Sequence, residues 1–493
     1  MSLIRQFAGQ TIIYGVSHIL SRILYYLVIN SYLTYTLEDS LEYGLYTVMY
    51  SYATIIVVLL SYRIDTAFFR FGSGKGQLEK AFSTAFFPLI FTTVLFVAGI
   101  ILFSEPLSAT VKLGAYPHYF KWFAIILGFD VLSLLPFGKF RLENKAKKFA
   151  IYKIASIFLT IILIFYFLEY YHPKFGGDGW VQKMFPAWGS LVDYVFIANI
   201  FASIAIFLLL ITNLKGIKFT VDWNLWKKMF WYSLPLIIVG VSNTINQYSS
   251  AQFQQFFLPG SNEENISEAG VYGAAMRLAA LLIMFNSAFN YAAEPFFFQN
   301  ASQKNDKNIY AKILSLYSIF AVAIIIMLVY NLELIAYLVD EQYRSGIYLI
   351  PILLLAYFML GLYYNVSIWY KLSDKTIYGS YISLVGVLVT VMISYNFIPI
   401  IGFAGSAWAA LACYSTMVIL ALLWGKKHYP IQYDYTKLIS LMAIVIGLIF
   451  LNQWIVALNM TVPKLIITKS LILLGFISFL VFTNISLLTE LRK

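Results

Sequence analysis

Polar residues follow one face of the apolar stretch that begins near residue 9. Thr11, Tyr14, His18, Arg22 and Tyr25 are spaced three or four apart, so they share a face if the stretch is helical. An arginine at the centre of a membrane helix costs about 2.5–3.5 kcal/mol on insertion scales and is expected to face a cavity or a partner. His18, Arg22 and Tyr25 are therefore candidate substrate ligands. Hydrogen bonding between helices, with no ligand, is the alternative interpretation.

A second polar stripe, uncharged, lies in a later apolar stretch. Asn243, Gln247, Ser250 and Gln254 supply donors and acceptors along one helical face, again with interhelical bonding as the alternative. Arg277 lies well inside the next stretch, about two turns from one end, where snorkelling to the interface is its alternative role. The two stripes predict a wet central cavity. A guanidinium binds phosphate oxygens bidentately, so a cationic cavity favours a phosphate-bearing cargo over a cationic one.

Two carboxylates are candidates for ion coupling. Asp130 lies inside an apolar stretch, where it carries a coupling proton or sodium ion or else pairs with a basic residue, and both interpretations stand. Glu294 continues a stripe with Asn286 and Asn290 that lies nearly opposite Arg277 if that helix is straight. On a straight helix Arg277 and Glu294 cannot both face one cavity, and Arg277 is the stronger candidate.

The rest of the sequence argues against enzyme chemistry. The segment FGSGKGQ lacks the spacing and the preceding strand of a P-loop, so ATP is not the expected energy source. The four histidines are scattered, and the lone Cys413 lies inside an apolar stretch, so neither a metal site nor a disulfide framework is expected. We expect no enzyme activity and no cofactor, with proton or sodium coupling as the open question.

These residues sit on membrane helices. Of the 493 residues 61% are hydrophobic and 12% charged, and the mean hydropathy is +0.77. Such values exclude a soluble globular chain. Apolar runs of the length that crosses a bilayer recur fourteen times and predict an all-α membrane protein. The predicted spans are roughly 9–33, 41–62, 82–103, 118–137, 150–170, 190–213, 229–256, 271–294, 311–331, 346–370, 377–398, 403–424, 437–457 and 464–488.

The net charge of +11 reflects topology and not nucleic-acid binding. The loops after the first, seventh and eleventh predicted spans have no Lys or Arg, whereas the alternate loops are basic. Because basic loops remain in the cytoplasm, both termini are predicted to be cytoplasmic, which requires an even number of spans.

A repeated motif suggests a duplicated architecture. Glu42 begins EYGLY, and 226 residues later Glu268 begins EAGVY. Six predicted crossings separate the copies, so both point the same way. This predicts two six-helix lobes as a parallel repeat (1–215 and 229–427), a cytoplasmic linker (216–228) and two C-terminal helices (428–493). The alternative is that the motif is only a common way to start a helix.

Several stretches carry a family resemblance. The segments EYGLYTVMYSYATIIVVLLSYRIDTAFFRF, GVYGAAMRLAALLIMFNSAFNYAAEPFFF and FIPIIGFAGSAWAALACY resemble Wzx-type polysaccharide flippases, in the superfamily that also holds the lipid II flippase MurJ and the MATE drug exporters. The resemblance implies a two-lobe core that moves undecaprenyl-pyrophosphate-linked oligosaccharide to the outer leaflet of the bacterial cytoplasmic membrane. A MATE-like exporter of organic cations and a lipid II flippase are the alternatives. Expected partners are the lipid-linked substrate, membrane lipids, and polysaccharide polymerase and chain-length proteins, with no nucleic acid.

The resemblance also indicates a cytoplasmic gate. In the family, the stretch that matches SYRIDTAFFRF ends in a basic residue near that gate, and Arg70 occupies this position. Arg63 lies seven residues earlier on the same helical face, with Asp65 nearby. Arg63, Asp65 and Arg70 are therefore gate candidates. Ordinary positive-inside charge is an equal alternative.

Overall fold

The structure, a computed structural model, describes residues 28–74, 76–175, 179–185, 190–214, 220–301, 308–373, 375–458 and 461–483. Within these ranges it is helical and contains no strand. Among the described residues, eleven helices are long and apolar enough to cross a membrane, or twelve if the bent pair α14–α15 counts as one span. The all-α, multi-pass fold is confirmed. The first predicted span lies mostly outside the described residues, so the count of fourteen stays a prediction.

Contacts divide the chain into two compact units, residues 1–270 and 271–493. The boundary falls inside a helix, α14, and so differs from the predicted linker at 216–228. The predicted lobe limits follow the sequence repeat and stay a prediction. We describe each unit by itself.

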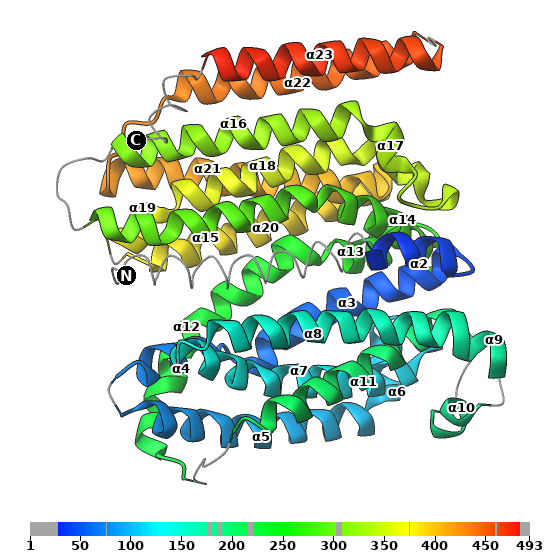
Figure 1. Ribbon diagram of the computed structural model, residues 1–493, viewed down its shortest axis with the longest axis vertical. Coiled ribbons are helices and arrows are strands. Elements are labelled where there is room, and N and C mark those ends of the chain that lie inside the picture. The colour runs from blue at the N-terminus through cyan, green and yellow to red at the C-terminus, as the bar shows by residue number, and fades with distance from the viewer. Residues whose placement is uncertain are drawn as a thin grey trace. The chain divides into compact units, whose positions relative to one another are not determined.

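The first unit holds a row of long helices in the order α5, α7, α11 and α8, each packed on the next (Figure 1). Helices α3, α4 and α12 pack beside this row. Its helices are α2 (Asn30–Thr36), α3 (Ser40–Ser61), α4 (Ile64–Gly72), α5 (Leu78–Leu102), α6 (Ser104–Thr110), α7 (Pro117–Leu142), α8 (Ala146–Phe165), the π-helical η2 (Tyr166–Tyr171), α9 (His172–Phe175), α10 (Trp180–Met184), α11 (Leu191–Ile211), α12 (Trp223–Tyr248), α13 (Ser250–Phe257) and the first half of α14 (Asn262–Ala279).

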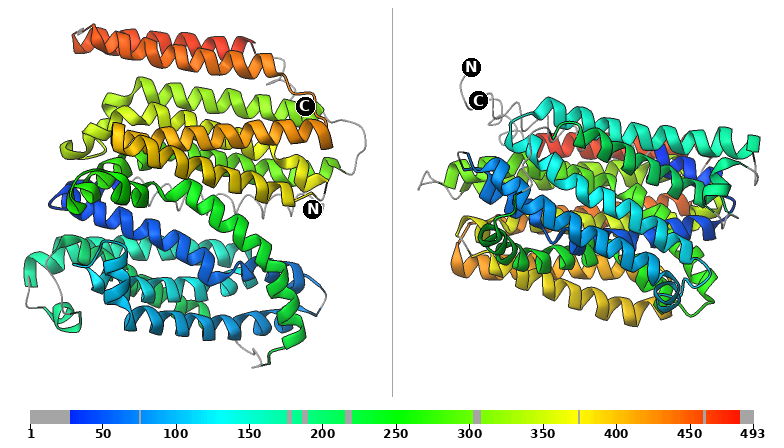
Figure 2. Two further views of the ribbon diagram at one scale, coloured as in Figure 1. Left: turned by 180° about the vertical axis from the view of Figure 1, so that it is seen from behind. Right: turned by 90° about the horizontal axis from the view of Figure 1, so that it is seen from below.

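The second unit has a similar row, α16, α18, α21 and α20, with α22 and α23 paired beside α16 (Figure 2). Its helices are α15 (Leu281–Ala301), α16 (Asn308–Tyr330), α17 (Leu332–Ala336), the 3-10 helix η4 (Glu341–Leu349), α18 (Ile350–Val366), α19 (Ile368–Leu372), α20 (Ile377–Ile401), α21 (Ala404–His428), α22 (Tyr435–Ala457) and α23 (Val462–Thr483).

Aspartates fix where several of these helices begin. The side chain of Asp39 accepts a hydrogen bond from the backbone N–H of Glu42, and Asp222 does the same for Leu225 and Asp434 for Lys437. An N-cap of this kind satisfies one of the backbone donors that the first helical turn leaves free. Short polar segments therefore set the starts of α3, α12 and α22, while the apolar runs set their lengths.

Candidate functional site

The second predicted span, 41–62, ends as expected, because α3 ends at Ser61. The helix breaks at Tyr62 and Arg63, and the chain then continues as α4 to Gly72. Tyr62 (φ 34°, ψ 33°) and Arg63 (φ 53°, ψ 27°) both adopt the left-handed backbone conformation, which is unfavourable for residues other than glycine. Such strain persists only where the surroundings enforce it, and it concentrates at functional sites. The break is therefore a candidate site.

Packing of α4 enforces the break. Ile64 and Phe68 have no exposed surface and belong to a cluster that includes Phe82, Leu135 and Met229 from three other helices. The hydroxyl of Ser233 on α12 donates a hydrogen bond to the carbonyl oxygen of Arg63 at 3.3 Å. Burial of these apolar side chains compensates for two left-handed residues.

The side chain of Arg63 lies against α12 at Gly240. A Cβ atom placed on Gly240 would lie 3.3 Å from Nε of Arg63 and 2.8 Å from Cγ1 of Val58. Gly240 is 17 residues into α12, about 25 Å along its axis, so Arg63 contacts the helix far from its start. The guanidinium is half-buried, and its buried Nε has no hydrogen-bond partner among the described residues. It is a cation with a donor available to a ligand.

The predicted polar stripe on α12 adjoins this arginine. Gly240, Asn243 and Gln247 are three and four residues apart and so share a face, with Asn243 exposed and Gln247 half-buried. The stripe was expected to continue to Gln254, but α12 ends at Tyr248 and Gln254 lies on α13, with no exposed surface. In the first unit a guanidinium thus contacts α12 at Gly240, and two amides follow along the same face of that helix.

The gate candidates have different surroundings. Arg70 is exposed, and its Cζ atom lies 4.4 Å from the ring centroid of Tyr232 on α12, a cation–π contact. Asp65 is half-buried in the first turn of α4, where a carboxylate is favourable to the helix dipole. Arg63 and Arg70 therefore do not form one charged cluster.

The remaining candidates are scattered. Asp130 on α7 is exposed and accepts a hydrogen bond of 2.7 Å from Ser203 on α11. Arg277 is half-buried in α14, three residues before a bend of 44° between α14 and α15. Because the helix is bent, the argument that separated Arg277 from Glu294 on a straight helix does not apply. The side chain of Glu294, and all of His18, Arg22 and Tyr25, lie outside what the structure describes.

The repeated motif has a structural role that its sequence did not reveal. Gly44 on α3 and Gly270 on α14 occupy equivalent positions in the two copies, and they face each other where the helices cross. A Cβ atom on Gly44 would lie 2.0 Å from the carbonyl oxygen of Ile266, and one on Gly270 would lie 2.8 Å from the backbone nitrogen of Gly44. Only glycine allows backbones to approach so closely.

No group of three or more His, Cys, Asp or Glu side chains that could hold a metal ion occurs in the described part of the chain. The side chains described at the site are cations and amides, which recognise ligands through hydrogen bonds and charge.

Comparison with known proteins gives a fold. No protein-family model and no curated protein matches the sequence. Among solved structures, the lipid II flippase MurJ in an inward closed conformation aligns with a TM-score of 0.71 at 15% identity, over 96% of this chain and 100% of its own. The chain has a MATE/MurJ-like fold. An inward-facing multidrug MATE transporter of the MOP superfamily aligns at 0.65 and 13% identity over 82% of this chain and 94% of its own.

A third structure, the MATE multidrug transporter DinF-BH, aligns at 0.61 with 16% identity over 87% of this chain and 97% of its own. The structural neighbours are thus transporters and a flippase, not enzymes. The MurJ alignment covers more of this chain than the two MATE alignments do. It also covers all of the MurJ chain, so the aligned fold spans nearly the whole length of both proteins.

Proposed function

We propose that the protein is a flippase that moves undecaprenyl-pyrophosphate-linked oligosaccharide from the cytoplasmic to the outer leaflet by alternating access, for surface polysaccharide synthesis. The observation that carries this proposal is Arg63. It is a half-buried cation at a strained helix break, with a buried donor that has no partner among the described residues. A pyrophosphate presents oxygens that fit a guanidinium through paired, charge-assisted hydrogen bonds.

The amides that follow Gly240 on the same face of α12 suit the rest of such a cargo. Asn243 and Gln247 offer both donors and acceptors, as sugar hydroxyls require. The cargo would thus place its pyrophosphate at Arg63 and its first sugars along α12. Arg22, the strongest candidate from the sequence, and Arg277 are proposed as further ligands of the cargo.

Two other functions compete with this one. The neighbour MurJ is a lipid II flippase, and lipid II is a related kind of cargo, so Arg63 would serve either flippase equally. A MATE-like exporter of organic cations is favoured by the neighbouring multidrug transporters. A half-buried arginine opposes that reading, because a cationic site repels a cationic drug.

Location and partners follow from the same proposal. The protein would lie in the bacterial cytoplasmic membrane with both termini in the cytoplasm, next to polysaccharide polymerase and chain-length proteins. It would use no cofactor, and Asp130, which is hydrogen-bonded to Ser203, is the best-described candidate for proton or sodium coupling.

Binding to the purified full-length protein tests whether the cargo is an anion or a cation. The protein should bind an undecaprenyl-pyrophosphate sugar and not ethidium. Arg63→Gln should weaken that binding about tenfold or more, and Arg63→Lys less, because a lysine keeps the charge and loses the bidentate geometry. Arg141→Gln is the matched control, since Arg141 is exposed and stacks on Phe69 at 4.6 Å. Tight ethidium binding without pyrophosphate affinity would reject the flippase.

A further inference from the structure

A cavity of about 450 Å³ lies in the second unit, where α16 ends and α17, η4 and α18 follow. Residues of α22 line the cavity as well. The volume is within the range of about 300–1,000 Å³ that is usual for small-molecule sites. Apolar side chains make up most of the lining: Val329, Leu332, Ile347, Pro351, Ile449 and Val456. The cavity can therefore take a hydrocarbon chain.

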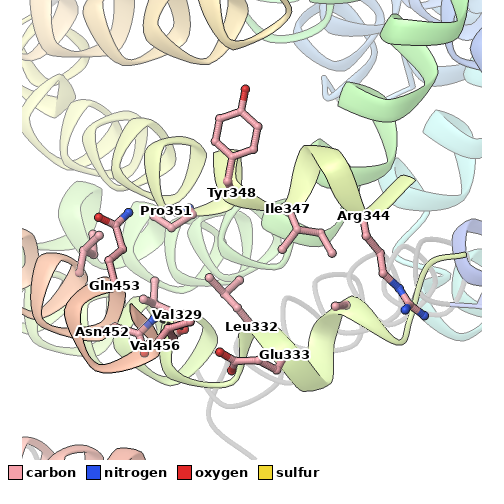
Figure 3. A pocket seen from close by; sticks show the side chains of 12 residues that line it. Val329, Leu332, Glu333, Arg344, Ile347, Tyr348, Pro351, Asn452, Gln453 and Val456 are labelled. Atoms are coloured by element: carbon pink, nitrogen blue, oxygen red, sulfur yellow. Dashed lines mark hydrogen bonds between the residues drawn. The ribbon is translucent and has the colours of Figure 1, made fainter. Parts of the chain in front are cut away.

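Polar groups stand on opposite sides of this cavity. Arg344 on η4 lies at one end of the lining, Asn452 and Gln453 on α22 lie at the other, and Glu333 on α17 lies between them (Figure 3). A ligand that fills the apolar middle would reach both sets. This separation suits an amphiphile with two polar groups better than a purely apolar molecule.

The carboxylate of Glu333 is paired with a lysine. An oxygen of Glu333 lies 2.5 Å from Nζ of Lys469 on α23, and the lysine side chain is only 6% exposed. This ion pair binds α23 to α17 and removes Glu333 as a partner for a second cation. Its charges cancel, and Arg344 then sets the net charge of the lining.

Arg344 has capacity left for an anion. It is half-buried, and its Cζ atom lies 5.1 Å from the ring centroid of Tyr337. Its buried Nε has no hydrogen-bond partner in the described part of the chain. A guanidinium with a free donor beside an apolar cavity matches a phosphate that carries a hydrocarbon chain.

Asn452 supplies the complementary acceptor. The side chain is 5% exposed, and its amide nitrogen donates to the carbonyl oxygen of Val329 at 3.4 Å. Its Oδ1 atom is buried and has no partner among the described residues. Buried acceptors in a membrane protein are normally satisfied, so a hydroxyl of a ligand is the expected donor.

We propose that this cavity is a binding site for an anionic glycerophospholipid, with its phosphate at Arg344, a head-group hydroxyl at Asn452 and an acyl chain along the apolar walls. The site lies where the spans α16 and α22 end, at Tyr330 and Ala457, which is the depth of lipid head groups. On the predicted topology this is the outer leaflet. A bound lipid would join the paired helices α22 and α23 to the rest of the second unit, independently of any cargo.

The test is thermal stability of the purified full-length protein in nanodiscs. Phosphatidylglycerol should raise the melting temperature relative to phosphatidylcholine, because only the first has a net negative charge and a free glycerol head group. Arg344→Gln should raise the apparent Kd for phosphatidylglycerol about tenfold, and Asn452→Leu should raise it less. Arg344→Lys retains the charge and should keep part of the affinity, which separates loss of binding from failure to fold. Arg141→Gln should leave the affinity unchanged.

Any of four outcomes would overturn the site. If both lipids raise the melting temperature equally, the cavity does not select an anionic head group. The same holds if phosphatidylglycerol stabilises the Arg344→Gln protein as much as the unchanged protein. Inorganic phosphate that reproduces the effect would make it a site for a free anion. Undecaprenyl phosphate that displaces phosphatidylglycerol at equal concentration would assign the cavity to the cargo lipid. The measurement requires no transport, so its failure is distinct from failure of the proposed function.

Discussion

The two helices that start with the repeated motif have kept some positions and lost others. Gly44 and Gly270, one from each copy, face each other where α3 and α14 cross. The equivalent tyrosines, Tyr46 and Tyr272, are both buried. The glutamates differ. Glu42 is buried and accepts a hydrogen bond from the backbone N–H of Leu191, whereas Glu268 is exposed. The shared glycines are therefore the positions at which the two copies of the motif contact each other.

The same helices break at different depths. In the first copy the break is at Arg63, 21 residues or about 32 Å after Glu42, and it uses two left-handed residues. In the second copy the bend of 44° lies between α14 and α15, close to Arg277, which is 9 residues or about 14 Å after Glu268. Each copy thus has an arginine near its break, but the breaks follow the packing of each helix and not the repeat.

The largest effect is expected from locking the crossing of α3 and α14. The hydroxyls of Ser40 and Ser267 are hydrogen-bonded to each other there. Cysteines at both positions, in a Cys413→Ser background, should form a disulfide and stop transport almost completely if the crossing must open in each cycle. Cargo export before and after reductant measures this, with each single cysteine as the control. Full export by the oxidised double mutant would mean that the crossing stays closed throughout the transport cycle.

A smaller effect should follow from adding one methyl group at the same crossing. Gly44→Ala places its Cβ against the backbone carbonyl of Ile266, which cannot turn aside as a side chain can. Overpacking of this kind costs about 1–3 kcal/mol, so the helices should separate and the yield of the disulfide between positions 40 and 267 should fall several-fold. Gly99→Ala on α5 is the control, because nothing lies within 4 Å of its added Cβ. An unchanged yield would contradict the close contact.

Hydrophobicity made most of the fold predictable, because an apolar run of span length has few alternatives in a membrane. The span predicted at 82–103 is observed at Leu78–Leu102, and that at 377–398 at Ile377–Ile401. The break at Tyr62–Arg63 could not be predicted, since the sequence there has no glycine or proline to mark it. Arg63 lies at the end of the span, as predicted, and the gate role assigned to it with Arg70 stays a prediction. The contact of Arg63 with α12 at Gly240 is set by tertiary packing and had no signal in the sequence. The glycine crossing had a signal, the repeat itself, but its meaning depended on which residues face each other.

A weaker effect should come from Gly240, which tests whether the first break positions its arginine. Gly240→Ala brings a Cβ atom to 2.8 Å from a methyl group of Val58 and to 3.3 Å from Nε of Arg63. Both neighbours are side-chain atoms and can shift, so the protein should fold, while the displaced guanidinium lowers cargo affinity a few-fold. Gly447→Ala, with no atom within 4 Å of its added Cβ, is the control for the assay. Equal affinities of the two variants would separate cargo binding from the break.

The smallest effect concerns the start of α12, the helix that carries the amides beside the break. Asp222 caps α12 and lies 2.7 Å from Lys80, whose hydrogen bond lowers the pKa of the aspartate below its ordinary value. Asparagine caps nearly as well as aspartate, so Asp222→Asn removes mainly an exposed ion pair, and such pairs contribute little. Because the pKa is lower in the folded protein, the stabilisation is present above the pKa of the unfolded chain, near 3.9, and is lost as the pH falls through the folded value. The melting temperatures of the two proteins should therefore differ slightly at pH 6 in low salt, and the difference should shrink both as the pH falls through the folded value and in high salt. A difference that changes with neither pH nor salt would show that the cap, and not the charge, is what Asp222 contributes to α12.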